Sequence, residues 1–204
     1  MLKKLASDAL GLSDIGKIID KKDFNRVDAD DYIMHEDGEQ IFFLIKSRTD
    51  EYCFTNLALI HVDGTSAVSK KRLVTRYDYY KNPISRVSIE TAGTIDLDCE
   101  IKFIIGEITF SIDVDRNQVE QLKDLYKSLV KIGHIIEENQ IMLEKSEETL
   151  NIAANAFASS KVVEGDAAVI FKNINEYAFN WTRISRETYV RKDFTDVFKN
   201  YINN

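Results

Sequence analysis

Apolar and polar residues alternate through the middle of the chain, as they do in strands that bury one face. The alternation is clearest from Thr94 to Phe103. One face of this stretch carries Ile95, Leu97, Cys99, Ile101 and Phe103. The opposite face carries Thr94, Asp96, Asp98, Glu100 and Lys102. The pattern predicts a half-buried strand whose acidic side chains are exposed.

Further segments have the same strand character, and short turns separate them. Including the stretch that begins at Thr94, the predicted strands span residues 40–47, 51–54, 57–62, 73–79, 85–91, 94–105 and 107–114. The turns contain Asp63-Gly64 and Asn82-Pro83, residue pairs that favour tight reversals. Gaps this short join antiparallel neighbours. We therefore predict a mainly β domain, an antiparallel barrel or sandwich, over residues 26–135.

The period changes to that of an α-helix on both sides of the β region. From Asn117 the apolar residues are spaced three and four apart, at Leu122, Leu125, Leu129, Ile132 and Ile136. This spacing predicts a long amphipathic helix that caps the β domain. Before the strands, Ser13 is expected to begin a short helix that ends at Ile19, within an N-terminal helical segment of residues 1–25.

Residues 136–204 are predicted to form an all-helical extension. The helical register continues through Leu143, Leu150 and Phe157, and Asp166 is expected to begin a second helix. A final helix is expected from about Glu187 to Tyr201. The second helix carries one apolar stripe, formed by Ile170, Ile174, Tyr177 and Trp181.

These apolar positions form a surface that the extension cannot bury by itself, because so small a unit has only a marginal core. Phe179, Phe194 and Phe198 add further apolar area. Packing on the β domain is an alternative, but it would leave the seam from Leu143 to Phe157 uncovered. We therefore expect neighbouring copies to cover the surface in a cyclic homo-oligomer.

Composition and charge narrow the choice of partners. The chain has 204 residues, a net charge of −7 and a hydrophobic fraction of 44%, which predicts a folded protein. Nucleic acid is not an expected partner, since affinity for phosphate backbones rests on Lys and Arg. No apolar run is long enough to cross a bilayer, and the first residues lack the apolar core of a secretory signal. With Cys53 and Cys99 predicted to be buried thiols, we expect a cytoplasmic protein.

Two small basic clusters are the candidate ligand sites. Their members are Lys70, Lys71, Arg72 and Arg76 in one cluster, and Lys46 and Arg48 in the other. Several cationic donors together suit a phosphate group, so these residues are candidates for binding anionic lipid headgroups or phosphorylated ligands. The alternative, which we prefer, is that they are charges on loops and edge strands that keep the sheet soluble.

The sequence offers no catalytic constellation. His35, His61 and His134 lie far apart and match no metal-binding or catalytic spacing. Successive acidic residues on one strand face, such as Asp96 and Asp98, are about 7 Å apart, which favours a solvated face over a metal site. We therefore expect no enzymatic activity, no metal and no cofactor.

Several motifs resemble one known family. The run from Asp50 to Asn56, the pair Asp63-Gly64, the stretch Glu90-Thr91-Ala92-Gly93 and the triplet Asp96-Leu97-Asp98 resemble the bacterial pleckstrin-homology (PH) domain family. Residues 136–204 are similar to the helical oligomerisation extension, the YvbH-like region, that some members carry. The resemblance implies a PH-like seven-stranded antiparallel barrel capped by an amphipathic helix, and homo-oligomeric rings. It implies no reaction.

Together these observations predict a non-enzymatic scaffold or interaction module that self-associates through its helical extension and binds a protein partner. The alternative is a peripheral protein that binds anionic headgroups at a membrane surface through the basic clusters. Leu57 and Ala58 stand where members of the family often have a Lys-Arg pair, and this difference disfavours the alternative.

Overall fold

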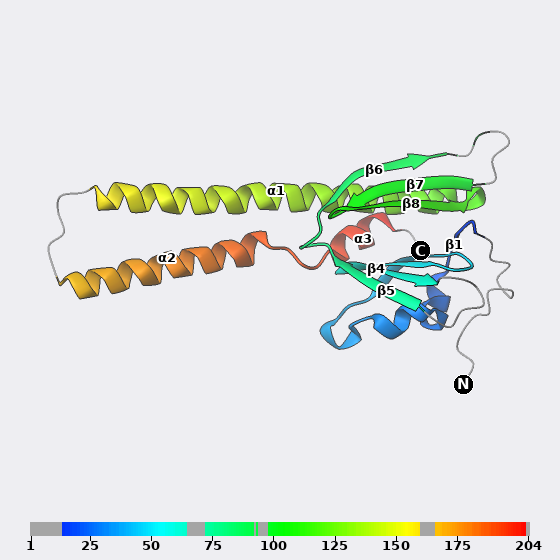
Figure 1. Cartoon of the computed structure of the whole chain (residues 1–204), viewed down its shortest axis with the longest axis horizontal. Helices are drawn as coiled ribbons and strands as arrows, with labels where there is room; N and C mark the ends of the chain where they lie inside the picture. Colours follow the sequence, from blue (N-terminus) through cyan, green and yellow to red (C-terminus); the bar gives the residue numbers. More distant parts are fainter. Residues whose placement is uncertain (1–13, 65–71, 92, 94–97, 160–165, 203–204) are drawn as a thin grey trace. The chain divides into compact units, whose positions relative to one another are not determined.

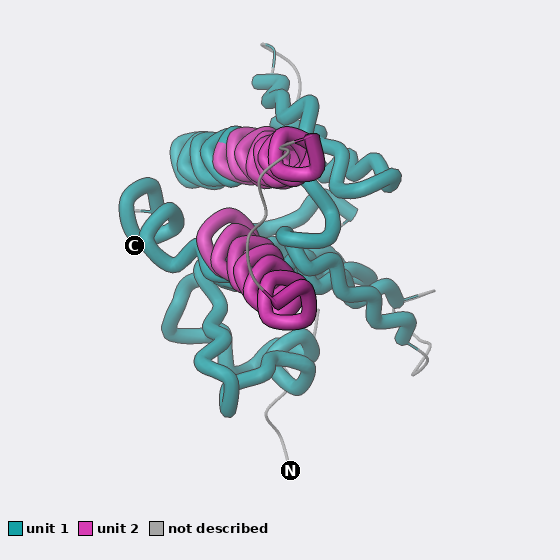
Figure 2. Tube along the Cα trace, turned by 90° about the vertical axis from the view of Figure 1, so that its left-hand side faces the viewer, with its two compact units in different colours: residues 1–134, 192–204 teal, residues 135–191 magenta. Residues whose placement is uncertain are grey.

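The computed structural model describes residues 14–64, 72–91, 93, 98–159 and 166–202. The chain divides into two compact units, coloured separately in Figure 2 and traced along the sequence in Figure 1. The first unit comprises residues 1–134 and 192–204, and the second comprises residues 135–191. The first unit therefore includes both ends of the chain.

The strands of the first unit form two antiparallel sheets. The five-stranded sheet has the order β1 (Lys17–Ile18), β2 (Ile41–Lys46), β3 (Glu51–Thr55), β4 (Ala58–Gly64) and β5 (Arg72–Asp78). The three-stranded sheet has the order β6 (Ile84–Glu90), β7 (Asp98–Ile105) and β8 (Ile108–Asp115). Strands β2 to β8 coincide with the predicted segments, so the predicted antiparallel β fold is confirmed.

Gly16 joins the two sheets. Its N–H donates to the carbonyl of Asp113 (N···O 2.8 Å), and its own carbonyl accepts from the N–H of Asp115 at 3.0 Å. A Cβ atom at this position would lie 2.7 Å from Cγ2 of Ile45, so only glycine allows the approach. The connection makes a partly closed barrel in which β5 and β6 are the terminal strands of the described arrangement.

Aromatic side chains fill the space between the sheets. Phe110 of β8 lies 6.1 Å from Tyr52, 5.7 Å from His61 and 5.5 Å from Tyr77, measured between ring centroids. Edge-to-face contacts of this kind stabilise a core beyond the area that they bury. In β7 the residues Cys99, Ile101, Phe103 and Ile105 are all buried. The predicted burial of one face is thus confirmed from residue 98 onward, whereas Asp98 and Glu100 on the other face are half-buried and not exposed as predicted. Asp96 and Leu97 lie outside the described residues.

Three short 3-10 helices cover the outer face of the five-stranded sheet: η2 (Lys21–Arg26), η3 (Asp28–Tyr32) and η4 (His35–Asp37). The helix expected to end at Ile19 is absent from the described residues 14–19, so this prediction is wrong there. The backbone is extended because the N–H of Ile18 donates to the Gln118 side chain and that of Ile19 donates to the carbonyl of Leu44.

The long helix α1 (Val119–Ala158) begins next to the barrel and continues into the second unit. Asp115 caps the short 3-10 helix that leads into it, η5 (Arg116–Gln118), by accepting from the N–H of Asn117 at 2.9 Å. The apolar residues of its first turns, among them Leu122 and Ile132, are fully buried. A Cβ at Gly133 would lie 2.5 Å from the carbonyl O of Ile84, so the helix passes close to the start of β6. The predicted capping helix is confirmed.

Two further helices follow: α2 (Ala167–Tyr189) in the second unit and α3 (Thr195–Tyr201) in the first. The single helix predicted from Glu187 to Tyr201 is therefore wrong, because residues 190–194 are not helical. Phe194 and Phe198 are fully buried in the first unit. The expectation that they need cover from neighbouring copies is also wrong, since the barrel itself supplies that cover.

Candidate functional site

The candidate anion-binding residues that the structure describes are ion-paired, two of them with buried glutamates. Glu51, whose side chain is 5% exposed, pairs with Lys46. The Glu51 carboxylate also accepts the backbone N–H groups of Asp28 (3.2 Å) and Ala29 (2.7 Å). Arg72 lies 3.6 Å from the Asp28 carboxylate. These bonds fasten the segment of short helices to the sheet.

A second glutamate, Glu39, has a side chain that is 0% exposed. It accepts from the N–H of Met34 at 2.9 Å, from the hydroxyl of Thr55 at 2.5 Å and from Arg76 at 2.9 Å. Arg76 also donates to Asp78 at 2.6 Å. Desolvation raises the pKa of the Asp78 carboxyl, but the hydrogen bonds and charges of Arg76 and Lys81 together outweigh it and hold that pKa below its ordinary value.

The two basic clusters therefore do not form one patch. Lys46 lies in β2 and Arg76 in β5, with two strands between them. Arg48 pairs with the exposed Asp14 at 2.8 Å. Lys70 and Lys71 lie outside the described residues. Some counter-ions, such as Asp14 for Arg48 and Glu39 for Arg76, are distant in the sequence, so composition alone could not reveal them.

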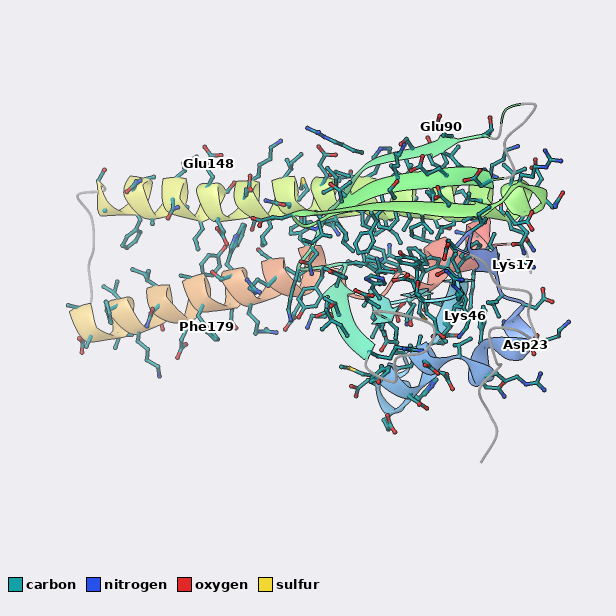
Figure 3. All side chains as sticks on the ribbon, turned by 45° about the vertical axis from the view of Figure 1, so that its right-hand side comes forward. Lys17, Asp23, Lys46, Glu90, Glu148 and Phe179 are labelled. Carbon is teal, nitrogen blue, oxygen red and sulfur yellow. The ribbon has the colours of Figure 1, made fainter. Side chains whose placement is uncertain are left out.

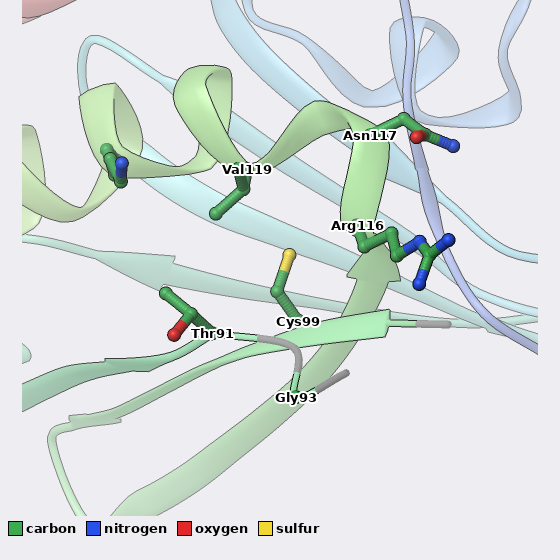
Figure 4. Close-up of a pocket in the computed structure, with 7 residues that line it drawn as sticks. Thr91, Gly93, Cys99, Arg116, Asn117 and Val119 are labelled. Carbon is green, nitrogen blue, oxygen red and sulfur yellow. The ribbon is translucent and has the colours of Figure 1, made fainter. Parts of the chain in front are cut away.

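A pocket of about 330 Å³ lies beside the start of α1 (Figure 4). It is lined by Thr91, Gly93, Cys99, Arg116, Asn117, Val119 and Lys123. The thiol of Cys99 donates to the carbonyl of Val114 at 3.4 Å, and burial raises its pKa. Lys123 pairs with Glu120 at 2.7 Å. A protonated, hydrogen-bonded thiol is not a nucleophile, so the geometry does not make this pocket a catalytic site.

His61 is the most enclosed of the three histidines. Its Nε2 lies 3.1 Å from Oδ1 of Asp50, and its ring stacks on Tyr52 with 4.6 Å between centroids. Burial raises the pKa of the Tyr52 phenol to about 12. In the described part of the chain, no three His, Cys, Asp or Glu side chains gather closely enough to hold a metal ion.

The second unit pairs two helices, residues 135–158 of α1 with α2, which we call the helix pair. Nε1 of Trp181 donates to the carbonyl of Ser146 at 3.1 Å, and the hydroxyls of Ser146 and Ser185 are 2.5 Å apart. Leu143 and Leu150 are half-buried one turn to either side of Ser146. The predicted seam on α1 therefore faces α2 of the same chain.

Large apolar side chains remain exposed on the helix pair. Phe171 is 72% exposed, Phe179 70% and Tyr177 62% on α2, while Ile152 is 61% and Phe157 46% exposed on α1. Of all the residues in α2, only Ser185 is buried. The helix pair thus has a thin internal seam and a broad apolar exterior.

The exposed positions only partly match the predicted oligomerisation residues. Among those predicted, the exposed ones are Phe157, Ile174 and Tyr177, and the half-buried ones are Leu143, Leu150, Ile170 and Trp181. Phe179 was predicted only as further apolar area, and it lies on the side of α2 away from α1 (Figure 3). Phe171 was not predicted, and its large aromatic side chain next to the stripe was the signal in the sequence that could have identified it.

Comparisons with known proteins agree with this architecture. The bacterial PH domain model matches residues 9–133, and the model of the YvbH-like oligomerisation region matches residues 144–204. The chain is 52% identical to the uncharacterized protein YvbH of Bacillus subtilis (strain 168), over the whole of both chains. It is 33% identical to the uncharacterized protein YjqA of the same organism over 97 residues, covering 47% of this chain and 76% of that protein.

A solved structure is also similar. The PH domain-containing bacterial protein from Exiguobacterium sibiricum 255-15 shares 46% sequence identity and gives a TM-score of 0.86, covering 93% of this chain and all of that one. Among the described residues, no helix is both long and apolar enough to cross a membrane. The chain belongs to the bacterial PH domain family, and its PH-like domain is followed by a YvbH-like oligomerisation region.

Proposed function

We propose that this protein is a non-enzymatic scaffold that self-associates through the helix pair. The observation that carries the proposal is the set of exposed aromatic side chains on α2, led by Phe171 and Phe179. Several large apolar side chains exposed on one element are typical of interaction sites in folded proteins. The name of the matched family model, an oligomerisation region, supports the same role.

The contrast between the two units supports this assignment. In the first unit the large aromatic residues of the core, such as Phe54, Phe103 and Phe198, are no more than 1% exposed. In the second unit, Phe171 and Phe179 are largely exposed to solvent. Each would gain about 2 kcal/mol from burial against another surface. Self-association removes this unfavourable exposure without any change in the barrel.

The assembly that we favour is a closed ring. Both helices of the pair carry exposed apolar residues, Ile152 and Phe157 on α1 and Phe171 and Phe179 on α2, and we propose that they serve as two complementary contact surfaces. When one surface of a copy contacts the other surface of the next copy, the contact is head-to-tail and closes into a ring at a suitable rotation. The expected species then has one mass that stops growing with concentration.

The test uses two substitutions at exposed positions of the full-length chain. The double variant Phe171→Ala/Phe179→Ala removes the apolar surface and should keep the helix, because alanine favours helices. The matched control is Lys172→Ala/Asn180→Ala, at exposed neighbours on α2. Light scattering during gel filtration should find an oligomer for the wild type and the control at tens of micromolar, and a smaller species for the double variant.

The single tryptophan, Trp181, reports whether the helix pair is intact, since its indole N–H is bonded to Ser146. The fluorescence of Trp181 depends on how deeply its indole ring is buried. It should be the same in the monomeric double variant and in the wild type at equal protein concentration. A wild-type chain that is monomeric at tens of micromolar would refute the proposal. An oligomer that persists unchanged in the double variant would place the interface elsewhere.

A further inference from the structure

Within the C-terminal segment, residues 190–202, the part from Asp193 onward makes contacts with the β domain like those that proteins make with bound peptides. The backbone N–H of Phe194 donates to the carbonyl of Asn56 at 2.9 Å. In return, the side-chain amide of Asn56 donates to the Asp193 carboxylate at 3.0 Å. One backbone bond and one side-chain bond therefore fix the start of the segment, as in main-chain recognition of a peptide.

Two phenylalanines four residues apart anchor the segment. Phe198 stacks on Phe42 of β2 with 5.3 Å between ring centroids, and Phe194 meets Tyr79 edge-to-face at 5.8 Å. Both phenylalanines are 0% exposed. Side chains at this spacing share one face of a helix, which is how an amphipathic helix enters an apolar site. We call Phe42, Asn56 and Tyr79 the docking surface.

One polar group of the docking surface is unpaired. Tyr79 is 0% exposed, and its hydroxyl has no hydrogen-bond partner among the residues that the structure describes. The rings of Phe194 and Phe198 pack on Tyr79 and offer no acceptor of ordinary strength. Buried hydroxyls in native proteins are nearly always paired, because an unpaired one is costly. The C-terminal segment is therefore an incomplete complement to the surface that holds it.

The segment also has the features of a detachable ligand. Its helix, α3, has seven residues, which is too short to be stable alone in water. Residues 190–194, which connect it to α2, are not helical. From Lys192 onward the segment belongs to the first unit, while α2 belongs to the second. Its order therefore depends on the docking surface and not on the helix that precedes it.

We infer that the docking surface is a binding site for a peptide segment of a partner protein, and that the C-terminal segment occupies this site in cis. The partner segment has an acidic residue followed by two aromatic side chains four residues apart, the chemistry of Asp193, Phe194 and Phe198. It also carries a side-chain acceptor that pairs with the Tyr79 hydroxyl. The chain thus inhibits its own partner binding until the C-terminal segment is released.

The test measures binding of a fluorescent synthetic peptide with the sequence of residues 190–204 to full-length proteins. In the released variant, Phe194→Ala/Phe198→Ala, the segment in cis no longer competes. Its affinity for the peptide, measured by fluorescence anisotropy, should exceed that of the wild type at least about tenfold. Adding Phe42→Ala to the released variant should remove most of this gain. A control peptide with alanine at both phenylalanine positions should not bind.

A milder variant keeps the test decisive if the released variant folds poorly. Asp193→Ala removes the carboxylate bonded to Asn56 and leaves both phenylalanines in place, so it should raise peptide affinity by about threefold. Equal peptide binding by wild type, Asp193→Ala and the released variant would overturn the inference. If the released variant loses its β-sheet circular dichroism signal, Asp193→Ala decides the test, and an affinity equal to that of the wild type would then overturn the inference.

Peptide binding is independent of self-association in this scheme. The variant Phe171→Ala/Phe179→Ala, which alters only the helix pair, should bind the peptide as the wild type does. A change in peptide affinity in this variant would contradict the assignment of the site to the first unit. The two proposals can therefore fail separately.

Discussion

Replacement of Tyr79 by phenylalanine should stabilise the protein, although tyrosine and phenylalanine differ only by one hydroxyl. In the described part of the chain, that hydroxyl is buried and unpaired. An unsatisfied buried polar group costs about 1–3 kcal/mol, and Tyr79→Phe removes this cost. The change leaves a gap no larger than one oxygen atom, which costs a few tenths of a kcal/mol. We expect a net gain of about 1 kcal/mol.

The assay is urea unfolding followed by far-ultraviolet circular dichroism. A gain of this size should also raise the melting temperature by about 2–4 °C in a chain of this length. The matched control is Tyr80→Phe, because Tyr80 is only half-buried and its ring keeps its contact with Lys192 after the change. The control should shift the free energy of unfolding by less than about 0.5 kcal/mol.

The same substitution has a signature at high pH. Burial raises the pKa of the Tyr79 phenol well above its ordinary value. The folded state therefore holds this proton more tightly than the unfolded chain, whose tyrosines titrate near pH 10. This term stabilises the fold fully below pH 10 and is lost as the pH rises toward the folded pKa. Stability of Tyr79→Phe should fall less steeply above pH 10.

A loss of about 1 kcal/mol or more in Tyr79→Phe at neutral pH would refute the reasoning. Such a loss would mean that the hydroxyl has a partner, such as a buried water molecule. The argument that the C-terminal segment leaves Tyr79 unpaired would then no longer support a second occupant of the docking surface.

Further outcomes are expected from the core and its ion pairs. Glu39→Ala should cost about 3–5 kcal/mol in urea unfolding, because it removes a buried carboxylate and leaves Arg76 without that partner. Ile101→Ala should lower the free energy of unfolding by about 2–5 kcal/mol, and Asp98→Ala should lower it by less than about 1 kcal/mol. Similar losses from both substitutions would contradict the register of β7. In a pH titration followed by absorbance at 295 nm, the Tyr52 phenol should ionise near pH 12. The variant Tyr52→Phe should lack this contribution to the absorbance change, which checks the assignment.

The strands were predictable because their signal is local. In β7, the buried faces of Cys99 and Ile101 follow from a period of two that any window of the sequence displays. Strand β1 has two residues and therefore no period. Its strand conformation depends on pairing with Ile45 and Lys46, which are distant in the sequence. No local pattern therefore argued against the helix that was predicted there.

The sites were less predictable because their partners are remote. Arg76 was a candidate anion ligand, yet its carboxylate partner Glu39 lies in another part of the chain. Phe198 was read as apolar area in need of a neighbouring copy, and its true neighbour is Phe42. Periodicity identifies an apolar face but not the surface that covers it.

Residues 192–204 group with the first unit, so the chain returns to the PH-like unit after the helix pair. Cutting the chain after the barrel would also remove Phe194 and Phe198 from the core. Protein design must therefore treat residues 135–191 as a cassette with two fixed ends. We expect that residues 135–191 can be exchanged for the matching segment of a relative, or lengthened by whole helical turns, when residues 192–202 are kept.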